Sequence, residues 1–123
     1  MPWSAFRFGK LNVEFRDQRV VEIVEALVDF HQQDTDRHFP EWLAVALPDW
    51  KCQCELPPGC IAISLEKLLT SEQRVSEFCD LLARLAESLA NEDLLVAEKL
   101  KTLRGYLLNN ELRRSPEPVV VYG

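Results

Sequence analysis

Hydrophobic and polar residues alternate in the first part of the chain. Phe6 and Phe8 lie two positions apart, Leu11, Val13 and Phe15 continue the alternation, and Gly9 and Lys10 separate the two runs, residues 3–8 and 11–16. Period-two alternation is typical of a strand with one buried face, and a two-residue connection that begins with glycine is typical of a tight hairpin turn. The pattern therefore predicts an N-terminal β-hairpin over residues 3–16.

Four later segments have the spacing of amphipathic helices, with apolar residues recurring every three or four positions. They cover residues 18–33, 40–47, 71–90 and 92–108. Asp17, Asn91 and either Thr70 or Ser71 are predicted to cap three of these helices, because short polar side chains accept hydrogen bonds from the first free N–H groups. Pro40 suits the first position of the short second helix.

Alternation returns between residues 49 and 65. The apolar positions of the first half are Trp50, Cys52, Cys54 and Leu56. The sequence Pro57-Pro58-Gly59 is typical of a turn, and residues 60–65 alternate again. We therefore expect a second β-hairpin over about residues 49–65.

These elements predict a single α+β domain over residues 1–115. Its two hairpins, residues 3–16 and about 49–65, are expected to join in one antiparallel sheet, with about four helices packed against the apolar face. The last residues, 116–123, form a strand-like tail that either adds an edge strand to the sheet or docks elsewhere.

The composition of the chain limits the classes of function that it can have. The chain has 123 residues, 47% of them hydrophobic, and a formal net charge of −6. This content supports a packed core and argues against disorder. The negative charge argues against a nucleic-acid partner, because phosphate binding requires a basic surface. Neither a signal peptide nor an apolar run long enough for a membrane helix is visible, so we expect a cytoplasmic protein with no membrane contact.

The charge is unevenly distributed. Residues 1–98 carry 18 acidic and 9 basic side chains, a balance of −9, whereas residues 99–123 carry 2 acidic and 5 basic ones, a balance of +3. Carboxylates recur at helical spacing and continue along the chain: Glu22, Glu25, Asp29, Asp34, Asp36 and Glu41. This stripe is either an ordinary solvated face or a docking surface for a basic partner.

The four cysteines allow several interpretations. Cys52, Cys54 and Cys60 have a spacing found in some zinc clusters, and Cys79, His31 and His38 are the candidates for a further ligand. However, the alternation places Cys52 and Cys54 on the same predicted strand face as Trp50, and Cys79 lies on the apolar stripe of its helix. Core packing is therefore favoured over zinc binding, and zinc over disulfide or redox chemistry.

A metal-dependent enzyme is a weaker alternative. His31, Asp34, Asp36 and His38 lie within eight residues and are types that bind divalent metals or transfer protons. His31, however, falls within the apolar stripe of residues 18–33, which favours a partly buried histidine. The sequence has no nucleophile elbow and no phosphate-binding loop. We expect no enzyme activity and no cofactor.

The sequence thus predicts a small acidic protein-binding module. By analogy of size and charge, the most favoured class is an inhibitor of the bacterial immunity or antitoxin type, whose carboxylates neutralise a basic toxin such as a nuclease. The residues expected to bind the partner are the six carboxylates of the stripe, with Trp42 as an aromatic anchor. The alternative is an adaptor or assembly subunit that binds a partner, or a second copy of itself, through its sheet edge or its tail.

Overall fold

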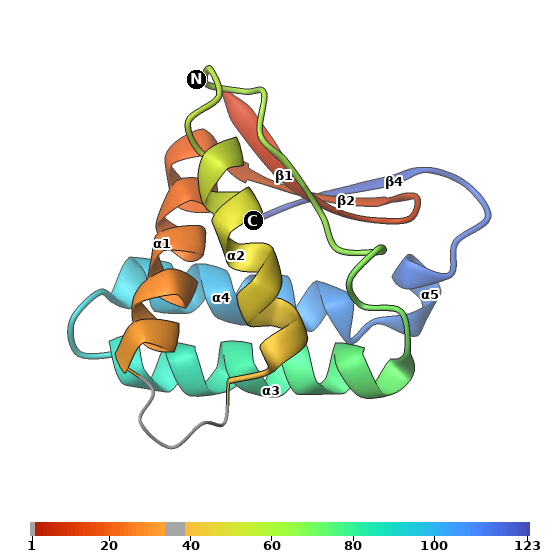
Figure 1. Cartoon of the computed structure of the whole chain (residues 1–123). Coiled ribbons are helices and arrows are strands. Elements are labelled where there is room, and N and C mark those ends of the chain that lie inside the picture. Colours follow the sequence, from red (N-terminus) through yellow and green to blue (C-terminus); the bar gives the residue numbers. More distant parts are fainter. Residues whose placement is uncertain (1, 34–38) are drawn as a thin grey trace.

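The structure, a computed structural model, describes residues 2–33 and 39–123 of the chain. Figure 1 shows a sheet packed on a layer of helices. The elements in chain order are β1 (Trp3–Phe8), β2 (Leu11–Arg16), α1 (Asp17–Gln33), α2 (Glu41–Gln53), β3 (Ala62–Ser64), α3 (Glu72–Leu89), α4 (Leu94–Leu107), α5 (Asn110–Arg113) and β4 (Val119–Tyr122). The predicted α+β class is confirmed.

The N-terminal hairpin forms as predicted. β1 and β2 pair in antiparallel fashion, with Phe6 opposite Val13 and Phe8 opposite Leu11. Gly9 occupies the turn with a φ of 58°, a left-handed conformation that glycine adopts without steric cost. Because alternate residues face opposite sides of a sheet, Phe6, Val13 and Leu11 share the face that the helices cover.

The sheet is mixed rather than antiparallel. Its strand order is β3-β1-β2-β4, and both outer strands run parallel to their neighbours. The parallel pairs are β1 with β3 and β2 with β4, and a parallel pair requires a long crossover. Helices α1 and α2 lie in the chain between β1 and β3, and all five described helices lie in the chain between β2 and β4.

The predicted second hairpin is wrong. Residues 49–53 end helix α2, which continues through Pro48, and only Ala62–Ser64 forms a strand. The apolar positions Leu43, Leu47 and Trp50 recur at helical spacing and are buried. Their burial overrides the short alternation beyond Trp50, and α2 continues through Pro48, an exposed residue that donates no backbone N–H to the helix.

The described residues form five helices rather than about four, because a short helix, α5, follows α4. Ser71 caps α3 as predicted, and its hydroxyl accepts from the N–H of Arg74. α4 is capped by Asp93 and not by Asn91. Asp17 is the first residue of α1, and its Oδ1 accepts from the hydroxyl of Ser4 at 2.7 Å and from the N–H of Gly59 at 3.0 Å.

One core joins the two layers. α3 and α4 pack against each other, α1 packs on β1 and β2, and α2 packs on α1 and β3. Full burial of each large apolar side chain contributes about 1.5–3 kcal/mol. The largest buried side chains come from both layers: Phe6, Leu11, Phe15, Ile23, Leu27, Leu43, Ile61, Ile63, Leu65, Phe78, Leu81 and Leu82. None of the described helices is both long and apolar enough to cross a membrane.

The tail is an edge strand, one of the two outcomes predicted for it. β4 pairs with β2, with Val121 opposite Val13. Side chains from other elements also hold it: the Tyr106 hydroxyl donates to the Tyr122 carbonyl at 2.9 Å, and the Trp3 and Tyr122 rings meet edge to face at 5.2 Å.

Candidate functional site

Helix α1 carries acidic residues on the side that faces away from the sheet. Its buried residues Val20, Ile23, Val24 and Leu27 fix the orientation of the helix. Glu25 and Asp29 are exposed on the other side, and the side chain of Glu22 is 23% exposed. Residues three and four apart lie on one helix face, so the three carboxylates form a continuous row.

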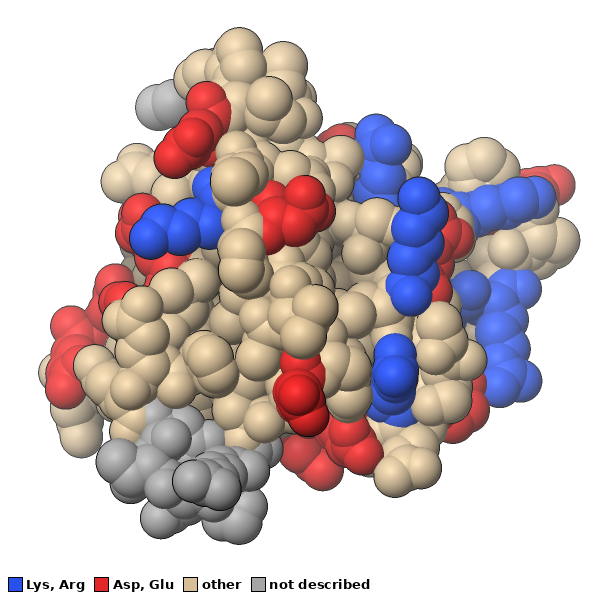
Figure 2. All heavy atoms as spheres, in the orientation of Figure 1, with Lys and Arg blue, Asp and Glu red and all other residues tan. Residues whose placement is uncertain are grey.

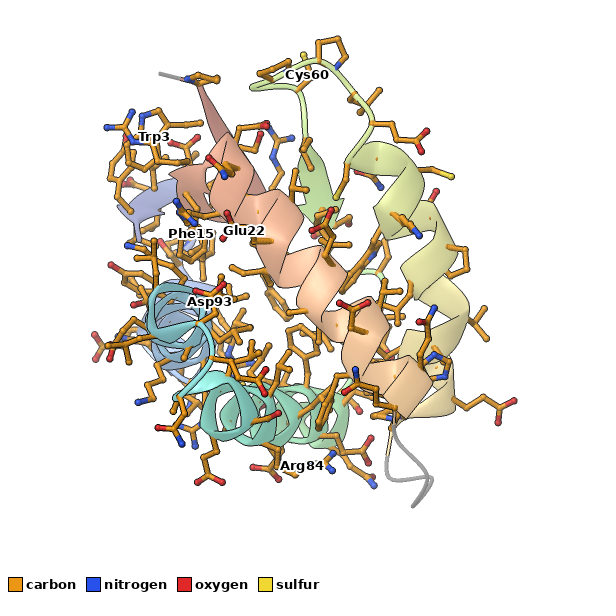
Figure 3. The ribbon with its side chains drawn as sticks, turned by 90° about the vertical axis from the view of Figure 1, so that its left-hand side faces the viewer. Trp3, Phe15, Glu22, Cys60, Arg84 and Asp93 are labelled. Atoms are coloured by element: carbon orange, nitrogen blue, oxygen red, sulfur yellow. The ribbon has the colours of Figure 1, made fainter. Side chains whose placement is uncertain are left out.

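The turn between α3 and α4 lies across from this row. It contributes Glu92 and Asp93, and together with Glu22, Glu25 and Asp29 they line a groove of about 290 Å³. We call it the acidic groove. Figure 3 shows Glu22 on α1 and Asp93 at the helix turn on opposite sides of the same gap.

The other residues that line the acidic groove are mostly apolar. Apart from the five carboxylates, the lining residues are Ala26, Phe30, Gln33, Leu85, Ser88, Leu89 and Val96. The groove thus combines carboxylates with hydrocarbon surface. This combination suits the long side chains of lysine and arginine, which are apolar along the stem and charged at the end.

Two of the five carboxylates already have partners. Glu22 pairs with Arg19 at 2.5 Å, and Asp93 accepts from the N–H of Val96 at 3.2 Å and so caps α4. By contrast, Glu25 and Asp29 form no ion pair with any residue in the described ranges. Lys51 of α2 lines a second, smaller hollow together with Glu25 and Asp29.

The remaining predicted contact residues lie elsewhere. Glu41 and Trp42 line a separate, wider hollow between the start of α2 and α3. Trp42 is half-buried: its Nε1 donates to Glu77 at 3.1 Å, and the Arg74 guanidinium lies 5.1 Å from its ring centre. The predicted Asp34 and Asp36 lie outside the described residues.

Sequence reasoning missed Glu92 and Asp93. The signal was the acidic pair Glu92-Asp93 between two amphipathic helices. A short connection makes neighbouring helices antiparallel and brings their turn to one end of the pair. That α1 lies beside this end depends on long-range packing, which no local pattern encodes.

The histidine prediction is wrong in one respect. His31 is exposed at the end of α1 rather than partly buried, and its ring lies 4.7 Å from that of Phe39. His38 lies outside the described residues. Within residues 2–33 and 39–123, no three histidine, cysteine or acidic side chains are grouped as metal ligands.

The cysteines divide between surface and core. Cys79 is buried as predicted, but Cys52 and Cys60 are exposed and Cys54 is half-buried. Cys52 lies in the last turn of α2 and Cys54 caps that helix, so neither lies on the predicted strand face. Burial raises the pKa of the Cys79 thiol to about 11. Burial, with the nearby carboxylates of Glu25 and Asp17, also raises the pKa of the Cys54 thiol to about 11. Both thiols are therefore protonated at neutral pH.

The basic C-terminal end has internal partners. Figure 2 shows Lys and Arg gathering on the side of the molecule that carries α5 and the β1–β2 turn. There Arg113 forms two hydrogen bonds of 3.1 Å with Glu72, and Arg114 forms a third of 3.1 Å. We call these three residues the Glu72 cluster. The Nε of Arg104 donates to the Cys79 carbonyl at 3.2 Å. These bonds pair part of the positive charge of residues 99–123 with groups of the same chain.

Comparison with known proteins yields no match: no family model, no curated protein and no solved structure is similar to the chain at a significant level.

Proposed function

We propose that the chain is an acidic protein-binding module that inhibits a basic partner, with the acidic groove as the contact surface. The observation that carries the proposal is the convergence of five carboxylates from α1 and the α3–α4 turn, among which Glu25 and Asp29 have no ion pair with a described residue. Lysine or arginine side chains of a partner supply the missing positive charge.

The lining of the groove suits single arginine or lysine side chains that insert into it, rather than long-range attraction to a basic surface alone. The hydrocarbon stem of either residue packs on apolar lining residues such as Leu89 and Phe30, while its charged end reaches the carboxylates of the groove. Arginine fits best, because its planar guanidinium bonds a carboxylate through two parallel N–H groups.

Inhibition follows from competition for the same cations. A nuclease binds the phosphates of its substrate through lysine and arginine, and the carboxylates of an inhibitor occupy those groups instead. The net charge of −6 steers the encounter with a basic protein over a longer range than direct contact. In this proposal the partner is a toxin of the nuclease class, and inhibition takes place in the cytoplasm.

The test begins with affinity purification of the tagged chain from cells that express it, at low and at moderate salt, with mass spectrometry of the proteins retained. The expected result is a basic protein that is retained most strongly at low salt, and whose nucleic-acid cleavage the purified chain inhibits. Capture of acidic or neutral proteins alone would contradict the proposal.

A matched pair of variants locates the contact. The first carries Glu25→Gln, Asp29→Asn and Glu92→Gln in the acidic groove. The second carries Glu55→Gln, Glu98→Gln and Glu117→Gln at exposed positions outside the groove lining, with the same change in net charge. We expect the first to lose the partner and the second to retain it. Equal loss in both would show that only the overall charge matters, and would remove the acidic groove from the account.

A further inference from the structure

β4 is an open sheet edge that lacks the usual protection. It has β2 on one side only, and all its residues, Val119–Tyr122, are uncharged. Val120 is 46% exposed and Tyr122 is 59% exposed. Natural edge strands avoid pairing with other chains through charged side chains, proline or bulges. β4 has proline only in the segment that precedes it, at positions 116 and 118.

Two backbone hydrogen bonds to β2 determine which backbone groups of β4 face the open edge. The N–H of Val119 donates to the Lys10 carbonyl at 2.9 Å, and the N–H of Gly123 donates to the Glu14 carbonyl at 2.8 Å. Because N–H and C=O groups of successive strand residues point to alternate sides, Val120 directs its N–H and C=O away from β2. The N–H of Tyr122 and the C=O groups of Tyr122 and Pro118 point the same way.

One of these outward groups is already satisfied. The Tyr122 carbonyl accepts a hydrogen bond from the Tyr106 hydroxyl of α4 at 2.9 Å. The open edge therefore offers two donors, the N–H groups of Val120 and Tyr122, and two acceptors, the carbonyls of Val120 and Pro118. This set is self-complementary.

We propose that two copies of the chain pair through β4 in antiparallel orientation, with Val120 of each copy on the two-fold axis. In this register the two Val120 residues exchange N–H and C=O bonds, and each Tyr122 N–H donates to the Pro118 carbonyl of the second copy. Pro118 has no N–H, and the carbonyl opposite it, that of Tyr122, is the one that Tyr106 satisfies. Every outward backbone group then has a partner, and the two sheets become one.

Other antiparallel registers leave groups unmatched. Moving the axis one residue toward the C-terminus directs the Val120 N–H at the Tyr122 carbonyl, which Tyr106 already occupies. Moving it one residue toward the N-terminus places the Val120 carbonyl opposite Pro118, which has no N–H to donate. The proposed register also covers the exposed side chain of Val120 with its own copy and sets Tyr122 beside Pro118.

This inference is independent of the acidic groove, which is formed by other elements. It is tested by the sedimentation velocity of the full chain over a range of micromolar concentrations at moderate salt, because the like net charges of two copies repel. The expected result is a reversible dimer of twice the 14.2 kDa chain mass. A monomer at every concentration would overturn the proposal.

Substitutions separate this edge from other modes of association. Val120→Lys places two ammonium groups side by side on the axis and is expected to raise the dimer dissociation constant by about tenfold or more. The Val120 side chain is exposed and its N–H is not used by β2, so folding tolerates the change; circular dichroism checks this. Val120→Thr keeps a β-branched, uncharged strand and should leave the dimer intact. Val45→Lys, at a position 74% exposed on α2, is the control for added charge.

Hydrogen exchange supplies a readout that does not depend on substitution. The Val120 N–H should exchange more slowly as the concentration rises, while the Val121 N–H, which faces β2, should stay protected throughout. A dimer that forms without protection of Val120, or that persists undiminished in the folded Val120→Lys variant, would show that a different surface is used and would overturn the proposed pairing.

Discussion

The acidic groove and the Glu72 cluster place the same residue types in opposite situations. In the Glu72 cluster, Arg113 and Arg114 both bond to one carboxylate, and the side chain of Arg113 is only 6% exposed. In the acidic groove, Glu25 and Asp29 lie one helical turn apart and have no ion pair with a described residue. One site satisfies its charges within the chain, and the other leaves them for a partner. We assign binding to Glu25 and Asp29, the like charges that repel each other in the free protein.

The largest expected effect on stability comes from the Glu72 cluster. Arg113→Ala removes a buried side chain that bonds Glu72 twice and lies beside the Phe8 ring, at 5.8 Å. We expect the free energy of unfolding to fall by about 1–3 kcal/mol, through lost packing and lost hydrogen bonds. Urea denaturation measures the change.

Arg114→Ala is the matched control, because Arg114 bonds the same carboxylate from a position that is 69% exposed. Exposed ion pairs contribute about 0–1 kcal/mol, so this variant should unfold close to the parent. Equal losses in the two variants would show that burial of Arg113 does not distinguish the cluster from an ordinary surface pair.

Removal of charge from the groove should act in the opposite direction. Glu25→Gln removes a carboxylate three residues from Glu22 and four residues from Asp29. Like charges at this spacing destabilise a helix by about 0.2–0.5 kcal/mol per pair, so the free energy of unfolding should rise by that order. A gain in stability with a loss of binding is the pattern expected of a functional surface. A loss of stability would mean that Glu25 has a structural role.

The smallest effect is on pH dependence. Hydrogen bonds from Arg113, and then from Arg114, hold the pKa of Glu72 below its ordinary value. A carboxyl group with a lowered pKa in the folded state stabilises the protein above its unfolded pKa, and this contribution is lost as the pH falls through the folded pKa. Glu72→Gln should therefore lower stability slightly at neutral pH and not at strongly acidic pH. Urea midpoints of the parent and the variant, measured from neutral to strongly acidic pH, test this prediction. A difference between the two midpoints that stays constant over this range would refute it.

The two regions also differ in how far the sequence predicts them. The hairpin of residues 3–16 and the acidic row on α1 follow from local periodicity, because Gly9 fixes the turn and the buried valine and leucine positions orient the helix. Residues 49–56 follow two periods at once. Their alternation favours a strand, but Trp50 continues the helical spacing set by Leu43 and Leu47, and burial of these three side chains decides the outcome.

The second wall of the acidic groove could not be predicted in the same way. Glu92 and Asp93 belong to a turn that lies beside α1 because α3 and α4 pack against each other and both contact α1. The burial of Arg113 depends likewise on the contact between α5 and the start of α3. Local patterns predict which face of an element is apolar, whereas the identity of its neighbours depends on the whole core.

The most direct test of the central claim is the salt dependence of association with the basic partner. The rate constant for the parent chain should fall steeply as salt rises, because opposite charges steer the encounter. With Glu25→Gln, Asp29→Asn and Glu92→Gln in the groove, association at low salt should slow by about tenfold or more and its salt dependence should flatten. The matched variant outside the groove should stay close to the parent. Identical kinetics in the two variants would contradict the account.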